Sequence, residues 1–166
     1  MLRTIIMTIL FLWSSQTPVS AGDTSMESCL QHSLTTVLSG GDMTPYLDTV
    51  AIIITMVGRQ NTEILEDKSL LREMSETVLA VLAERVRNNG KRYQGAVVHV
   101  HSYDHTAATG LITTITGHNY AFKVLGNFTS GHCQIRQLAI EDLFRLTSWL
   151  ARQPAVARIM SKHHLK

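Results

Sequence analysis

The stretch SLLREMSETVLAVLAERVRNNGKRYQGAVVHVHSY, residues 69–103, contains the change of hydrophobic period that decides the fold. In its first part, apolar residues recur every three or four positions, which predicts an amphipathic helix over Ser69–Asn88. Gly90 follows and is of the residue type that commonly ends a helix. From Tyr93 to Tyr103 the apolar residues alternate with polar ones, which predicts a strand. Helices should therefore precede this point in the chain, and strands should follow it.

The segment before residue 69 contains the start and stop signals of two further helices. Thr24 or Ser25 can cap a first helix, which Gly40-Gly41 should stop. Thr44-Pro45 is a cap followed by proline at a first helical position, and it predicts a second helix over Tyr46–Val57. The run Ile52-Ile53-Ile54-Thr55 is β-branched, so a buried strand stays open as an alternative there.

The segment after residue 103 predicts three more strands and a last helix. The strands are expected at Leu111–Thr116, Tyr120–Leu125 and Cys133–Ile140, with turns at residues 117–119 and 127–131. A helix should run from Glu141 to Arg152, where Pro154 breaks it. The order predicts an α+β domain, with helices packed on one face of a curved, roughly four-stranded antiparallel sheet.

The N-terminus is typical of an exported protein. Arg3 precedes the apolar run Ile5–Trp13, and a polar segment then ends in Val19-Ser20-Ala21. This pattern predicts a secretory signal peptide over residues 1–21, cleaved after Ala21, and a single domain over residues 22–166. Nine apolar residues cover only about 14 Å as a helix, which is too short for a membrane anchor. We therefore expect a periplasmic protein that does not span the membrane once the signal is removed.

Charge and cysteine content restrict the classes of binding partner and the states of the two cysteines. The formal net charge of +2 comes without a basic stripe, so we expect no nucleic-acid binding. Cys29 and Cys133 could form a disulfide in an oxidising compartment, or they could be two separate buried thiols. Sequence alone leaves both possibilities open, because it does not place their Cα atoms.

The segment His99-Val100-His101-Ser102-Tyr103-Asp104-His105 is the strongest candidate for chemistry. It is similar to the HxHxDH signature of the metallo-β-lactamase superfamily, with one extra residue before the aspartate. Because that insertion moves Asp104 and His105 out of register, two solvated histidines and a polar turn are the simpler interpretation. The chain also lacks a Gly-x-Ser-x-Gly elbow and a glycine-rich phosphate loop. We expect no enzyme, no metal site and no cofactor.

The remaining feature is a large supply of aliphatic side chains on the inward faces. They predict either an ordinary core or the walls of an apolar ligand cavity, and composition does not separate the two. The residues are Val50, Ile53, Ile54, Val57, Leu71, Met74, Val78, Leu82, Val98, Val100, Leu111, Ile115, Phe122 and Val124.

Three stretches carry a resemblance to a known family. The chain resembles the periplasmic MlaC / toluene-tolerance family of soluble phospholipid carriers. The matching segments are Tyr46–Ala51 leading to Met56–Arg59, then Tyr93-Gln94-Gly95 followed by Val97–Val100, and last Phe122–Leu125 with Cys133–Glu141. Cys133 stands where the family has a tryptophan, and Asp142 stands where it has a glycine.

The resemblance implies a function. Helices and a curved sheet would enclose a dry cavity for phospholipid acyl chains, and a membrane-anchored lipid-transfer complex would receive the cargo. Burial of each CH₂ is worth about 0.8 kcal/mol, so no catalytic residue would be needed. Gly58 and Arg59 would be structural residues at a helix end. The alternative is an exported domain of the NTF2-like type that acts as a protein-interaction module without lipid.

Overall fold

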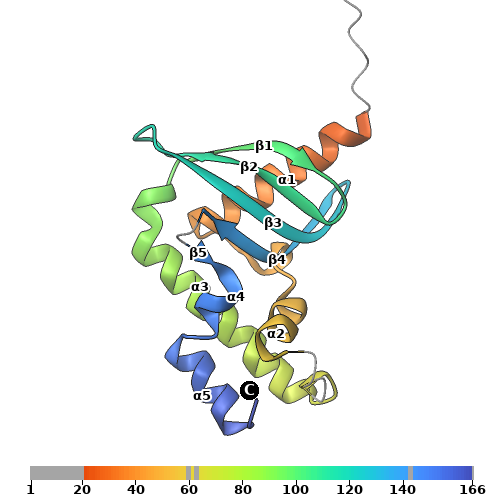
Figure 1. The fold of residues 1–166 in the computed structure, drawn as a ribbon, viewed down its shortest axis with the longest axis vertical. Coiled ribbons are helices and arrows are strands. Elements are labelled where there is room, and N and C mark those ends of the chain that lie inside the picture. The colour runs from red at the N-terminus through yellow and green to blue at the C-terminus, as the bar shows by residue number, and fades with distance from the viewer. Residues whose placement is uncertain (1–20, 59–60, 62–63, 142–143, 166) are drawn as a thin grey trace, which may run out of the picture.

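Figure 1 shows the computed structural model of the chain, which describes residues 21–58, 61, 64–141 and 144–165. The predicted signal peptide lies almost entirely outside these residues. The helical half consists of α1 (Ala21–Ser39), the 3₁₀ turn η1 (Thr44–Tyr46), α2 (Thr49–Val57) and α3 (Lys68–Tyr93). The second half consists of β1 (Val97–Tyr103), β2 (Ala107–Thr113), β3 (Asn119–Thr129), β4 (His132–Ile140), β5 (Phe144–Arg145), α4 (Leu146–Leu150) and α5 (Pro154–Lys162).

The predicted α+β class is confirmed. The strands form one antiparallel sheet in the order β1-β2-β3-β4-β5, so each strand pairs with its neighbours in the sequence. The sheet has five strands where four were expected, because β5 forms where the last helix was predicted to begin. The helices α2 and α5 lie at the end of the molecule away from β1, β2 and β3, and α3 runs from that end up to the side of the sheet (Figure 1).

Two glycines on the inner face allow the sheet to bend. A Cβ added at Gly110 would overlap the carbonyl oxygen of His99, and one added at Gly126 would overlap that of Gln134. The rings of Phe122 and Phe128 pack over these two positions. Register shifts after Val100 in β1 and after Leu125 in β3 add local twist. Glycines and bulges at such positions are the usual origin of strong sheet curvature.

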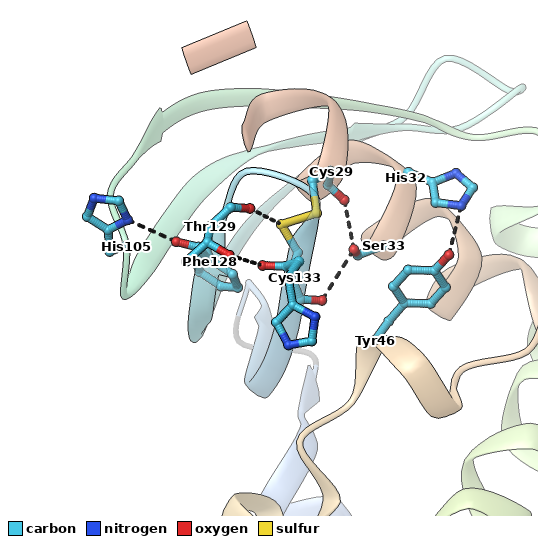
Figure 2. The surroundings of a disulfide bond; sticks show 9 residues. Cys29, His32, Ser33, Tyr46, His105, Phe128, Thr129 and Cys133 are labelled. Atoms are coloured by element: carbon cyan, nitrogen blue, oxygen red, sulfur yellow. Dashed lines mark hydrogen bonds between the residues drawn. A yellow bond between two sulfur atoms is a disulfide. The ribbon is translucent and has the colours of Figure 1, made fainter. Parts of the chain in front are cut away.

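Helix α1 packs on the inner face of this curved sheet. It contacts β1, β3 and β4, and its Leu30 and Leu34 side chains are fully buried. The disulfide between Cys29 of α1 and Cys133 of β4 joins the two elements, with the Cα atoms 6.0 Å apart (Figure 2). Ser33 lies beside the bridge and donates a hydrogen bond to the Cys29 carbonyl oxygen at 2.7 Å. The helix therefore fills much of the space that the curvature creates.

Helix α2 is bounded by residues that cap its two ends. Asp48 caps α2 by accepting a hydrogen bond from the Ala51 amide at 2.9 Å, so the isoleucine run is helical rather than extended. Gly58 ends α2 with a φ of 78°, directly after the predicted last residue Val57, while Arg59 lies outside the described residues.

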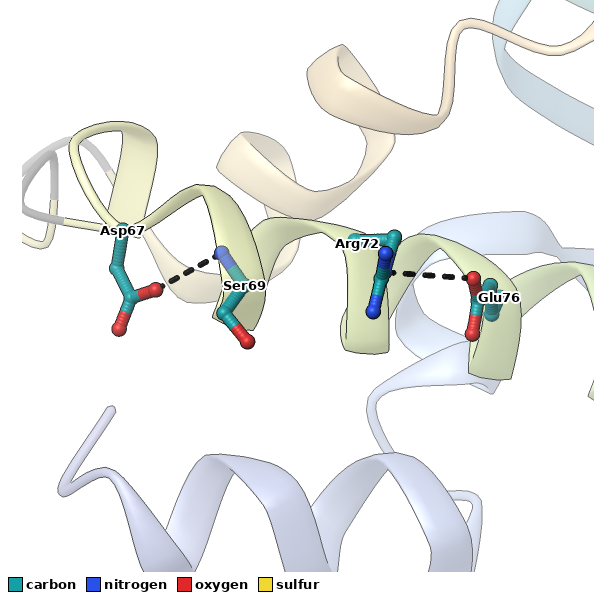
Figure 3. A network of polar contacts seen from close by, with 4 residues as sticks. All are labelled: Asp67, Ser69, Arg72 and Glu76. Carbon is teal, nitrogen blue, oxygen red and sulfur yellow. Dashed lines mark hydrogen bonds and ion pairs between the residues drawn. The ribbon is translucent and has the colours of Figure 1, made fainter.

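Helix α3 begins at a similar cap. Asp67 accepts a hydrogen bond from the Ser69 amide at 3.0 Å, and one turn further on Arg72 and Glu76 form an exposed ion pair at 3.7 Å (Figure 3). The helix continues past Gly90 to Tyr93, so the predicted end at Gly90 was wrong. One interior glycine costs only about 1 kcal/mol, and the contact between the Tyr93 and Tyr120 rings holds the last turn.

The second strand begins earlier than the alternation predicted. Asp104 accepts hydrogen bonds from the amides of Thr106 and Ala107, and this turn starts β2 at Ala107. The strand then ends at Thr113 rather than Thr116, because the Gly117 amide binds the Thr114 carbonyl oxygen and closes the hairpin.

Two further segments differ from the prediction. The turn expected at residues 127–131 is shorter, since β3 continues to Thr129 and pairs with the start of β4. The single last helix is instead β5, α4 and α5. Pro154 occupies the first helical turn of α5, where its missing amide hydrogen is not needed.

Two residues expected to face inward are exposed. Ile115 is 72% exposed, because it lies in the β2–β3 turn rather than in a strand. Val50 is 39% exposed, because Ile52, Ile53 and Val57 form the buried face of α2. The prediction that Leu111 faces inward from β2 was also wrong.

Ile112 is the inward residue of β2. It is fully buried, whereas Leu111 is only half-buried on the opposite face beside His99 and Ala121. The other predicted inward residues of β1 and β3, Val98, Phe122 and Val124, are buried, and Val100 is half-buried.

Candidate functional site

An apolar cavity of about 120 Å³ lies where α1, α3 and the end of the sheet meet. The C-terminal part of α1 and the loop after it form one wall, the second half of α3 forms another, and the last residues of β4 with β5 and α4 close it. The lining residues are Val37, Leu38, Met43, Leu82, Arg85, Val86, Arg92, Tyr93, Leu138, Ile140, Phe144 and Leu146.

Arg85 is the most unusual member of this lining. It comes from α3 on the side that carries apolar residues, and its guanidinium carbon is 4.6 Å from the ring centre of Phe144 and 4.5 Å from that of Trp149. Partial burial lowers the pKa of Arg85, but a guanidinium remains charged at neutral pH. The two rings offset part of the cost of desolvating this cation, since cation–π contacts are worth about 0.5–2 kcal/mol.

A second polar group lies at the end of α3. The Tyr93 ring meets the Tyr120 ring edge-on at 6.2 Å, and Arg92 lies 5.5 Å from the Tyr120 ring centre. Burial raises the pKa of Tyr93, so its phenol is neutral at pH 7 and can donate a hydrogen bond. Two arginines and one phenol therefore border an otherwise aliphatic and aromatic space.

An open groove of about 510 Å³ adjoins the cavity between α3 and the start of α5. Arg85 lines both spaces, so it forms the boundary between the apolar interior and the solvent-facing groove. Trp149 and Gln153 form the other side of the groove, and the Gln153 amide donates a hydrogen bond to the Trp149 carbonyl oxygen at 3.1 Å. A molecule with an apolar end and a polar end would match this pair of spaces.

The predicted cavity residues are placed elsewhere for the most part. Among the fourteen, Leu82 lines this cavity. Others are core residues in direct packing, as with Ile53, Val57, Met74 and Val78, while Ile54 and Leu71 are half-buried. The aliphatic pattern was thus mostly an ordinary core, which was one of the two interpretations.

Sequence reasoning missed most of the actual lining. One signal was available, because Arg85 occupies a position on the apolar stripe of α3, between Leu82 and Val86. An arginine at such a position must have either a partner or a path to solvent. The contribution of β4, β5 and the loop after α1 has no local signature in the sequence.

The cavity is small compared with ordinary ligand sites. Pockets for drug-sized ligands measure about 300–1,000 Å³, and an engineered cavity of about 150 Å³ binds benzene. At about 120 Å³, the space matches a small ring or about five carbons of a chain. Two complete acyl chains of a phospholipid would need a wider cavity than this conformation contains.

The histidine-rich segment does not assemble a metal centre in the described part of the chain. His99 and His101 are exposed on the sheet, and the Asp104 carboxylate is engaged by the amides of its own turn. His105 bonds the Phe128 carbonyl oxygen through Nδ1 at 3.0 Å (Figure 2). No group of three or more His, Cys, Asp or Glu side chains that could hold a metal ion occurs among the described residues.

Comparison with known proteins adds no assignment. The sequence matches no known family model, and no curated protein matches it significantly. In the residues that the structure describes, no helix is both long and apolar enough to cross a bilayer.

Proposed function

We propose that this protein is an exported carrier that binds the apolar end of a small amphiphile or of an acyl chain. The observation that carries the proposal is the apolar cavity between α1, α3 and the sheet, bordered by polar groups on its solvent side. The Cys29–Cys133 bridge supports an oxidising compartment such as the periplasm, since disulfides persist there and are rare in the cytosol.

The cavity sets the strength of binding to be expected. Five buried methylene groups contribute about 4 kcal/mol at about 0.8 kcal/mol each. That free energy corresponds to a Kd near 1 mM, which suits a carrier that must also release its ligand. In a broader version of this proposal, the protein carries a whole phospholipid and delivers it to a membrane-anchored complex. That version requires the cavity to widen.

A series of straight-chain alcohols tests both forms by isothermal titration calorimetry. Each CH₂ that enters the cavity should raise affinity about fourfold. We expect the rise to stop after about five carbons for a rigid cavity, whereas a rise that continues to about ten or twelve carbons would support a cavity that widens for lipid. A lipid-free interaction module would bind none of the alcohols, and that result would refute the proposal.

Two variants tie the binding to this cavity. Val37→Phe places a ring in the cavity and should abolish hexanol binding, while Ile115→Phe adds the same ring at an exposed hairpin turn and should leave binding unchanged. If Val37→Phe fails to fold, Leu82→Ala provides the opposite change, because a larger cavity should favour octanol over hexanol. Equal binding by all these variants would place the ligand elsewhere.

A further inference from the structure

The charged side chains described at the cavity border are all of one sign. Arg85 and Arg92 both line the cavity, and among the described residues no carboxylate is part of its lining. Among the described residues, the ion pair seen in α3 joins Arg72 to Glu76 and involves neither of them. Glu84 lines the adjoining groove and is exposed, so it does not face the cavity. The charged side chains that the structure describes in this lining are therefore both positive.

Arg85 is also held in a way that leaves its donors available. The Phe144 and Trp149 rings contact the guanidinium group at 4.6 and 4.5 Å, which fixes its position. Cation–π contacts use the charge of the group, whereas its N–H donors lie in its own plane. Carboxylates and phosphates accept two parallel hydrogen bonds from such a fork.

We infer that the ligand carries an anionic head group, a carboxylate or a phosphate, which binds Arg85 while the apolar chain occupies the cavity. Arg92 adds a second positive charge at the border, and the neutral Tyr93 phenol can donate a further hydrogen bond. This inference rests on the proposed function and narrows it to acidic amphiphiles. A fatty acid and a lysophosphatidic acid would share this chemistry, and neither would need a second acyl chain in the cavity.

The test compares probes that share a tail or a head. Hexanoate and 1-hexanol have the same number of carbons, acetate has the head group without the tail, and hexyl phosphate exchanges the carboxylate for a phosphate. Titration calorimetry of the purified, oxidised protein should show hexanoate or hexyl phosphate binding about tenfold or more tightly than hexanol, since a charge-assisted hydrogen bond has this strength. Acetate should bind far more weakly than hexanoate.

Variants then assign the preference to Arg85. In Arg85→Gln, hexanoate should lose its advantage and bind about as weakly as hexanol binds to the same variant. Arg72→Gln removes an exposed arginine from the same helix and is the matched control, with the preference expected to remain. Arg92→Gln should reduce the preference only in part.

The outcomes separate the two claims. Equal binding of hexanoate and hexanol by the wild type would overturn the head-group inference and leave the apolar site standing. Binding of neither probe would refute the proposed function itself. Equal loss of both probes in Arg85→Gln would show that Arg85 acts as a wall of the cavity, which also overturns its role as the anion ligand.

Discussion

Removal of the Cys29–Cys133 bridge gives the sharpest test of how this fold is held together. The two cysteines are 104 residues apart, so the bridge closes a loop that contains most of the helical half and most of the sheet. In the loop-entropy model, closing about 100 residues stabilises the folded state by about 4.7 kcal/mol. For a domain of this size, that loss lowers Tm by about 10–20 °C.

The assay is urea unfolding of four proteins under oxidising conditions: wild type, Cys29→Ala, Cys133→Ala and the double variant. Either single substitution breaks the bridge, so each should lose most of the 4–5 kcal/mol and the second substitution should add little. Cys133 is buried and Cys29 is half-buried, so a pure packing effect would instead be larger at Cys133 and would add up across the two sites.

Controls separate the covalent bond from its surroundings. Wild type with reductant should match the double variant, and Ser33→Ala should cost only about 0.5–1.5 kcal/mol, because it removes hydrogen bonds to the carbonyl oxygens of both cysteines but keeps the bridge. A double variant that loses less than about 1 kcal/mol would refute the reasoning. It would mean that α1 stays on the sheet through packing alone, and that the long loop is already restricted in the unfolded chain.

Three further predictions follow from individual contacts. Gly110→Ala should destabilise the protein by about 1–3 kcal/mol or more, because the added Cβ would meet the His99 carbonyl oxygen. Gly117→Ala has open space around its Cβ and should cost only about 1 kcal/mol for its positive φ. Equal losses of stability in urea unfolding would contradict the bend assigned to Gly110. Ile112→Ala should cost about 2–5 kcal/mol and Leu111→Ala clearly less, since Ile112 is the buried one, and the reverse order would show that the inward phase of β2 is misassigned. Hydrogen bonds, first from the Thr106 amide and then from its hydroxyl, lower the pKa of Asp104. Its carboxylate therefore stabilises the folded state above the unfolded-state pKa near 3.9, and this stabilisation is lost as pH falls through the folded-state pKa. The Tm values of Asp104→Asn and wild type should differ at pH 7 and converge toward pH 2, and a difference that does not change with pH would argue against the turn.

Local sequence signals predicted the elements but not the site. The period change at Tyr93 placed the helices before the strands, and Gly58 marked the end of α2, whereas the start of that helix was predicted at Tyr46 and lies at Thr49. Errors arose where side chains redirected the backbone, as Asp104 does at the start of β2. The cavity was missed because its walls come from four separate regions of the chain, and no local pattern links Val37 to Phe144.

The sequence by itself determined the α+β class, the antiparallel order and the inward faces of β1 and β3, because hydrophobic period and turn residues act over short distances. Only the tertiary structure decided what fills the curved sheet. The same aliphatic residues could have lined a large lipid cavity, but α1 is packed there and joined to β4 by the Cys29–Cys133 bridge. What remains open is a small apolar space bordered by Arg85, and its size depends on how distant elements pack rather than on any one segment.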